Sequence, residues 1–132
     1  MAGTPLTCSV ITPEARVFEA QVDEVVVPAH DGEIGIRRDR APLVCLLGAG
    51  RLKVRCGERT ECWFIDAGFA QVLDNRVVVL TQTALRPEEL SAEEARAALA
   101  ALPRIAPADE ADLRRHQRAQ ASARARLRMA GG

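Results

Sequence analysis

Turn signals divide the first 84 residues into short apolar runs, and this spacing constrains the fold more than any other feature of the chain. In the clearest run, Leu52, Val54 and Cys56 alternate with basic residues, as expected of a strand with one buried and one solvated face. An Asp-Asn pair at 74–75 separates two further runs, and both residue types tolerate the left-handed angles of a tight hairpin turn. The pattern predicts a mainly β domain, a sandwich or barrel of about eight to ten short strands.

The expected strands follow one another with short connections. We place them at 6–11, 16–20, 22–27, 34–36, 43–47, 51–56, 61–66, 69–73 and 76–81. The single tryptophan and all three phenylalanines lie in this part of the chain. Residues 1–84 are therefore expected to form a domain that folds independently of the rest.

The segment 31–44 lies between two of these runs and is expected to be irregular. Glycines permit backbone angles that other residues resist, and proline fixes φ and removes a donor. On this basis four residues are interpreted as structural loop residues: Gly32, Gly35, Pro42 and Gly68. The charged residues of the segment are predicted to face protein partners, with an ordinary exposed loop as the alternative. These residues are Asp31, Glu33, Arg37, Arg38 and Arg40.

The strand pattern stops at residue 84, and two helices are expected after it. Ser91 and Glu94 form a capping box that starts the first helix, and prolines bracket a break that begins at Pro103. The second helix is expected to run from near Asp109 to about Arg128. Its acidic residues come first and its arginines later, which is the order that the helix dipole favours.

The second helix carries a weak apolar seam and a cluster of arginines. The seam consists of Leu113, His116, Gln120, Ala123 and Leu127. Because it holds few large apolar residues, its docking is expected to be marginal. Arginines on another side of the helix are predicted to bind a partner: Arg114, Arg115 and Arg118. From residue 104 onward, seven arginines against three acidic residues give a charge of +4, balanced by −4 in residues 1–103. Such asymmetry often marks an interaction tail.

No set of residues recommends itself for catalysis. The chain has no Gly-rich phosphate loop, and His30 and His116 lie in different regions without a nucleophile beside them. The four cysteines lack zinc-site spacing and are interpreted as reduced, buried thiols. We therefore expect no catalytic residue, no cofactor and no metal. Without a secretory signal or an apolar run of about 18 residues, a cytoplasmic chain that does not insert into the membrane is expected.

A pattern of small and apolar residues runs through the segment that starts at Val25. It consists of Val25, Pro28, Ala29, Gly32, Ile34, Gly35, Ile36, Ala41, Pro42 and Leu43. Together with Thr12-Pro-Glu14 before it and 68–75 after it, the pattern resembles the epsilon subunit of F-type ATP synthases, which is called delta in mitochondria. The similarity runs from about Leu6 to Ala84. It implies a β-sandwich over residues 1–84 and an antiparallel helical hairpin over 85–132.

The resemblance also implies a function and partners. The chain would be a non-catalytic rotor subunit in the central stalk of a proton-translocating ATP synthase. Its sandwich would contact the gamma subunit and the c-ring, and its C-terminal helices would reach the beta and alpha subunits and inhibit ATP hydrolysis. It would be a peripheral protein on the cytoplasmic face of a bacterial inner membrane and would bind no nucleic acid.

Two departures from the family pattern bear on these expectations. Arg37-Arg-Asp-Arg40 stands where the family commonly has Leu-Pro-x-His, so contacts there are expected to be rewired. The ATP-binding pattern of some bacterial members would fall on Leu90–Ala95, where Ser91 and Glu94 replace its acid and its arginine. No functional ATP site is expected.

Two other classes of function remain as alternatives. A β-domain with an arginine-rich helix could bind nucleic acid, but 3% aromatic residues and a net charge of zero do not favour it. A small enzyme would require a perturbed acid, base or metal in a pocket, and the sequence nominates none.

Overall fold

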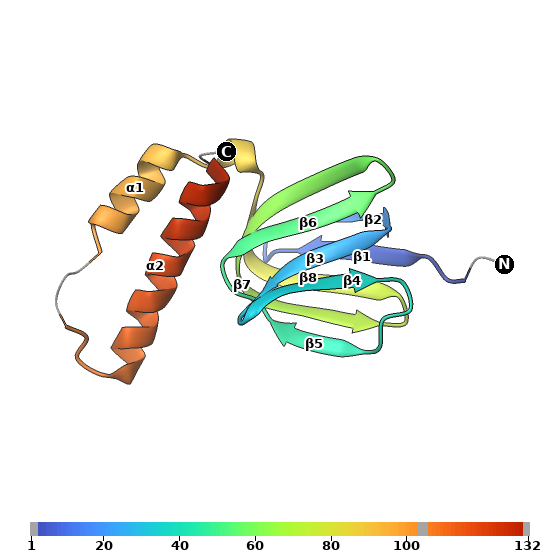
Figure 1. The fold of residues 1–132 in the computed structure, drawn as a ribbon, viewed down its shortest axis with the longest axis horizontal. Coiled ribbons are helices and arrows are strands. Elements are labelled where there is room, and N and C mark those ends of the chain that lie inside the picture. The colour runs from blue at the N-terminus through green and yellow to red at the C-terminus, as the bar shows by residue number, and fades with distance from the viewer. Residues whose placement is uncertain (1–2, 103–105, 131–132) are drawn as a thin grey trace.

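The computed structural model describes residues 3–102 and 106–130 (Figure 1). It contains β1 (Leu6–Ile11), β2 (Arg16–Val22), β3 (Glu24–Ala29), β4 (Gly32–Arg37), β5 (Leu43–Leu46), β6 (Gly50–Cys56), β7 (Arg59–Leu73) and β8 (Arg76–Leu85). A short 3-10 helix, η1 (Pro87–Glu89), leads to the helices α1 (Ala92–Ala100) and α2 (Glu110–Ala130). The expectation of a mainly β protein with a helical appendage is confirmed.

The strands fold into two layers that share one core. The strand order is β2-β1-β8-β7-β6-β3-β4, and β5 pairs with β7. β7 belongs to both layers, because residues 59–65 pair with β6 and residues 69–72 pair with β5. Side chains that alternate along the strands fill the space between the layers, as binary patterning requires. The fully buried ones include Val10, Val25, Val27, Ile36, Leu52, Ile65, Val77 and Val79.

The two strands predicted at 61–66 and 69–73 form a single strand, β7, so this prediction is wrong. Ala67 (φ 63°) and Gly68 (φ 119°) interrupt the extended backbone between them. The pairing with β8 nevertheless continues on both sides without a register shift. The buried hydroxyl of Thr81 donates to the Ala67 carbonyl at 2.8 Å. A hydrogen bond from β8 therefore satisfies the backbone where the strand is distorted.

The segment 31–44 is more regular than predicted, because β4 occupies its first half and pairs with β3 along its whole length. Gly35 lies inside this strand and is not among the residues with positive φ. A Cβ at this position would meet only Glu24 Oε2, at 3.7 Å. Gly35 is thus a strand residue rather than a structural loop residue. Pro42 lies in the irregular connection to β5, and Gly32 has a φ of 139° where β4 begins.

The two helices pack against each other, and α2 lies against β6 and β7 (Figure 1). The Ser91 side chain accepts a hydrogen bond from the Glu94 N–H at 3.1 Å, as the capping box predicts. The break predicted at Pro103 lies outside the described residues. No helix within the described ranges is both long and apolar enough to span a membrane.

The buried side of α2 includes most of the predicted seam and extends beyond it. Ala123 is buried, and three further seam residues are half-buried: His116, Gln120 and Leu127. Leu113 is exposed, and the other buried residues of α2 are Ala125 and Met129. The reason is that the C-terminal half of α2 meets the sandwich and Leu113 lies in the first turn. The position of the sandwich, rather than the largest side chains of the helix, decides which face is covered.

Candidate partner-binding surfaces

An apolar row crosses the outer face of the layer formed by β5, β7, β8 and β1. Leu46 pairs with Phe69, Phe69 with Leu80, and Leu80 with Ile11. Residues that pair directly project from the same face of a sheet, so the four side chains form one continuous row. Leu46 is 67% exposed and Phe69 44% exposed, so the row is an exposed apolar patch rather than a single exposed side chain. We call Ile11, Leu46, Phe69 and Leu80 the apolar row.

The surroundings of the apolar row extend the apolar surface. Val44, two residues before Leu46 on β5, is also 67% exposed. At the other end of the row, a hollow of about 350 Å³ is lined by three members of the row and by residues beside them: Ile11, Phe69 and Leu80, with Thr12, Pro13, Gly68, Thr81 and Gln82. Sequence reasoning missed this surface, although the uninterrupted apolar run at 43–47 was a signal: a strand without polar alternation is apolar on both faces.

The predicted partner-binding charges around β4 do not form one surface. Asp31 and Glu33 lie where the chain turns from β3 into β4, whereas Arg37, Arg38 and Arg40 lie at the other end of the strand. Five steps along a strand span about 17 Å. The structure therefore separates an acidic end from a basic end, and each can meet a different partner.

The basic end is held by the β7–β8 turn. The Asp39 N–H donates to Asn75 Oδ1 at 2.5 Å, and Asn75 Nδ2 donates to Asp39 Oδ1 at 3.2 Å. Arg37 Nε lies 3.0 Å from Glu24 Oε2 on β3. These contacts fix the loop at residues 37–40, and they leave the Arg38 and Arg40 side chains exposed.

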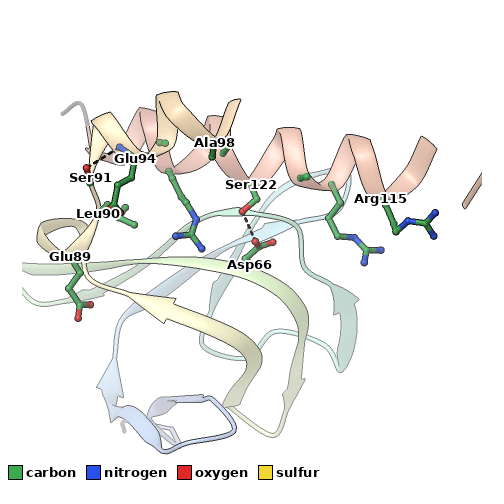
Figure 2. A pocket seen from close by; sticks show the side chains of 13 residues that line it. Asp66, Glu89, Leu90, Ser91, Glu94, Ala98, Arg115 and Ser122 are labelled. Carbon is green, nitrogen blue, oxygen red and sulfur yellow. Dashed lines mark hydrogen bonds between the residues drawn. The ribbon is translucent and has the colours of Figure 1, made fainter. Parts of the chain in front are cut away.

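A groove of about 580 Å³ lies between the helices and the sandwich (Figure 2). Arginines and carboxylates line it together: Arg115, Arg118, Arg126, Asp66, Glu89 and Glu94. Arg115 and Arg118 were predicted to lie away from the Leu113 and Leu127 seam, and they are exposed residues that line this groove, which neither leucine does. They share the groove side of the helix with Ser122, at spacings of seven and four residues. Arg114 forms an ion pair with Glu110, at 3.3 Å.

Three docking contacts hold α2 on the sandwich. Ser122 Oγ donates to Asp66 Oδ2 at 2.6 Å (Figure 2). The Arg126 guanidinium lies 4.7 Å from the centre of the Phe64 ring. Ala125 and Met129 pack against the same ring, which is fully buried.

The docking contacts stabilise the folded-back helix only modestly. A hydrogen bond to a charged group contributes about 1.5–3 kcal/mol, and a cation–π contact about 0.5–1 kcal/mol. Full burial of a phenylalanine contributes about 1.5–3 kcal/mol. Because the ordering of side chains opposes these terms, the net docking free energy is a few kcal/mol at most.

Comparison with known proteins identifies the family. The family model described as the β-sandwich domain of the ATP synthase delta/epsilon chain matches residues 5–87. The ATP synthase epsilon chain of Leptospira borgpetersenii is 38% identical over 113 residues, which cover 86% of this chain and 89% of that one. The epsilon chain of Rhodopirellula baltica is 41% identical over 95 residues, which cover 72% of this chain and 74% of that one.

Solved structures share the fold of both parts. A chain in the Euglena gracilis mitochondrial ATP synthase matches with a TM-score of 0.74 at 23% identity, over 97% of this chain and 82% of that one. A chain in the central stalk and c-ring structure of the Tetrahymena thermophila mitochondrial ATP synthase matches with a TM-score of 0.73 at 14% identity, over 98% of this chain and 99% of that one. The similarity inferred from Val25–Leu43 is thereby confirmed, and so is the expectation of an accessory chain rather than an enzyme. The chain belongs to the ATP synthase delta/epsilon chain family.

Proposed function

We propose that the chain is a rotor subunit in the central stalk of a proton-translocating ATP synthase, and that it is peripheral to the cytoplasmic face of a bacterial inner membrane. Family membership supports the role. The observation that carries the partner assignment is the apolar row. Exposed apolar side chains contiguous across four strands mark an interaction surface, whereas single exposed ones do not.

The apolar row is the surface for the gamma subunit. A subunit that turns with the stalk needs a lasting contact, and such contacts rest on large apolar side chains that are buried at their centre. Phe69 lies in the middle of the row and supplies the aromatic anchor. The acidic end of β4, with Asp31 and Glu33, contacts the c-ring. The two carboxylates set the orientation of the sandwich on the c-ring more than they increase the affinity of the contact.

A binding experiment with the isolated gamma subunit tests the assignment. The double variant Leu46→Glu, Phe69→Glu is expected to lose at least tenfold in affinity, because two carboxylates would be buried without partners. Val26→Glu is the control, since Val26 lies on the outer face of the other layer, between the inward-facing Val25 and Val27. Melting curves show whether each variant is folded. Equal affinity for the double variant and the control would contradict the assignment.

The helical hairpin is a brake on ATP hydrolysis. Its weak docking supports release, and α2 is 21 residues long, which corresponds to about 32 Å of reach. Release takes Arg115 and Arg118 out of the groove, so that together with Arg114 they meet acidic surfaces of the beta and alpha subunits. One exposed ion pair contributes less than about 1 kcal/mol, but three contacts desolvated together shift a two-state equilibrium by several kcal/mol.

Hydrolysis by the reconstituted catalytic head tests the brake. The comparison includes the intact chain, a chain that ends at Ala84, and the triple variant with Arg114, Arg115 and Arg118 changed to Glu. Arg96→Glu is the control, because Arg96 lies exposed on α1. We expect the catalytic head to hydrolyse ATP more slowly with the intact chain or the control than with the other two forms. Equal rates for all four across ATP concentrations would rule out a brake.

A further inference from the structure

The segment that connects the sandwich to the helical hairpin begins with Arg86, whose side chain contacts the sandwich. Its guanidinium carbon lies 4.1 Å from the centre of the Trp63 ring. Its Nη2 donates to Glu61 Oε1 at 3.0 Å. Both partners belong to β7, and Trp63 is only 2% exposed. A cation–π contact and a charge-assisted hydrogen bond thus tie the residue that follows β8 to the neighbouring strand.

The residues directly after Arg86 form one short, closed unit. The Arg86 N–H donates to Glu89 Oε2 at 2.7 Å, and the Leu90 N–H donates to the Pro87 carbonyl at 3.1 Å. Pro87 occupies the start of η1, where its fixed φ suits a helical turn. Residues 86–89 are therefore held on the sandwich through the side chain of Arg86.

Only two residues separate this unit from α1. Leu90 has φ −91° and ψ 145°, and Ser91 has φ −117° and ψ 119°. Both lie in the broad β region, outside the helical conformations of η1 and α1. Ser91 caps α1, and Leu90 packs beside Phe64. These two residues therefore connect residues 86–89, which are held on the sandwich, to α1, which belongs to the hairpin.

We propose that the hairpin turns about Leu90 and Ser91, and that Arg86 keeps η1 on the sandwich when the hairpin leaves. The inference rests on the release of the hairpin, which is part of the proposed function. It adds the position of the joint, Leu90 and Ser91, and the side chain that fixes this position, Arg86. A joint of two residues gives the released helices a fixed origin at one end of the sandwich. The hairpin then swings as a body over a restricted range, which a long flexible linker would not allow.

Fluorescence of the full chain tests the location of the joint, because Trp63 is the only tryptophan. Its side chain belongs to the inner core, whereas the neighbouring Phe64 faces α2. The Trp63 emission spectrum therefore responds to the position of Arg86 but not to the position of the hairpin.

Ala125→Glu and Met129→Glu are the release variants, since each places a carboxylate against Phe64. An increase in the radius of gyration in X-ray scattering reports release.

We expect the release variants to increase the radius of gyration and to leave the Trp63 emission spectrum unchanged. Arg86→Met is expected to alter that spectrum, and Arg96→Met, on exposed α1 surface, is the control that should not. An altered Trp63 spectrum in the release variants would overturn the location of the joint while leaving release intact. An unaltered spectrum in Arg86→Met would overturn the role of Arg86. No increase in size in either release variant would contradict release itself, and with it the brake.

Discussion

Gly68→Ala is predicted to be among the most destabilising single-methyl additions in the chain. Gly68 has a φ of 119°, which L-residues rarely adopt. The added Cβ would overlap the Leu80 carbonyl and lie 2.9 Å from the Thr81 Cα on the neighbouring strand β8. Both neighbours are backbone atoms in a central strand pair, so they cannot turn away as a flexible side chain would.

Substitutions at two other glycines separate the backbone strain of Gly68→Ala from its steric overlap. Gly57 has a φ of 63° and open space around it, so Gly57→Ala carries backbone strain alone, about 1–2 kcal/mol. Gly35 has neither feature, so Gly35→Ala is expected to change the free energy of unfolding by less than about 1 kcal/mol in either direction. At Gly68 strain of about 1–3 kcal/mol adds to the cost of separating β7 from β8. The sum is expected to be about 4 kcal/mol.

Urea unfolding followed by Trp63 fluorescence measures the three costs. A loss of about 4 kcal/mol is a large share of the 5–15 kcal/mol typical of a small domain, so Gly68→Ala is expected to unfold at a much lower urea concentration than the unchanged chain. The reasoning would be refuted if Gly68→Ala were no less stable than Gly57→Ala. A large loss in Gly35→Ala would equally contradict its placement inside an ordinary strand.

Four further predictions concern the hairpin, the acidic end, the domain boundary and a buried thiol. Ser122→Ala removes the hydrogen bond to Asp66 and should increase amide exchange in α2 about tenfold or more without lowering the sandwich melting temperature; unchanged exchange would argue against this contact. Glu33→Lys should spare folding and reduce proton-driven ATP synthesis in membranes, and unchanged synthesis would favour an ordinary exposed loop. A chain that ends at Ala84 should melt cooperatively, and a molten product would refute the proposed boundary. Burial raises the pKa of Cys8 to about 12, so at pH 8 a thiol reagent should modify exposed Cys56 and spare Cys8 until the chain unfolds; equal labelling in the folded chain would be the contrary result.

The period-2 pattern predicted most of the strands because it depends only on neighbours in the chain. It identified Leu52, Val54 and Cys56 as one face of β6, although Cys56 itself proves exposed at the end of the strand. It failed at Ala67 and Gly68, where a glycine that usually marks a turn lies inside β7. What keeps the strand continuous is pairing with Thr81 and Thr83 on β8, which local pattern does not reveal.

The surfaces were harder to predict than the strands. The charges around β4 are evident in the sequence, but the length of the strand that separates them follows from its pairing with β3. Similarly, the arginines of α2 stand out by composition, while the side that faces the groove depends on where Phe64 lies. The contact between Arg86 and Trp63 joins residues 23 positions apart, and no spacing rule brings them together. Sequence shows which chemistry is available, and packing decides where it is presented.

Purification of the chain at its native level from membranes tests the central claim most directly. The complex is recovered through an affinity tag, and its subunits are identified and counted by mass spectrometry. The account predicts gamma, beta and c subunits with the wild-type chain. It also predicts their loss with Leu46→Glu, Phe69→Glu but not with the control Val26→Glu. A wild-type chain that is recovered without these subunits would contradict the assignment to the rotor.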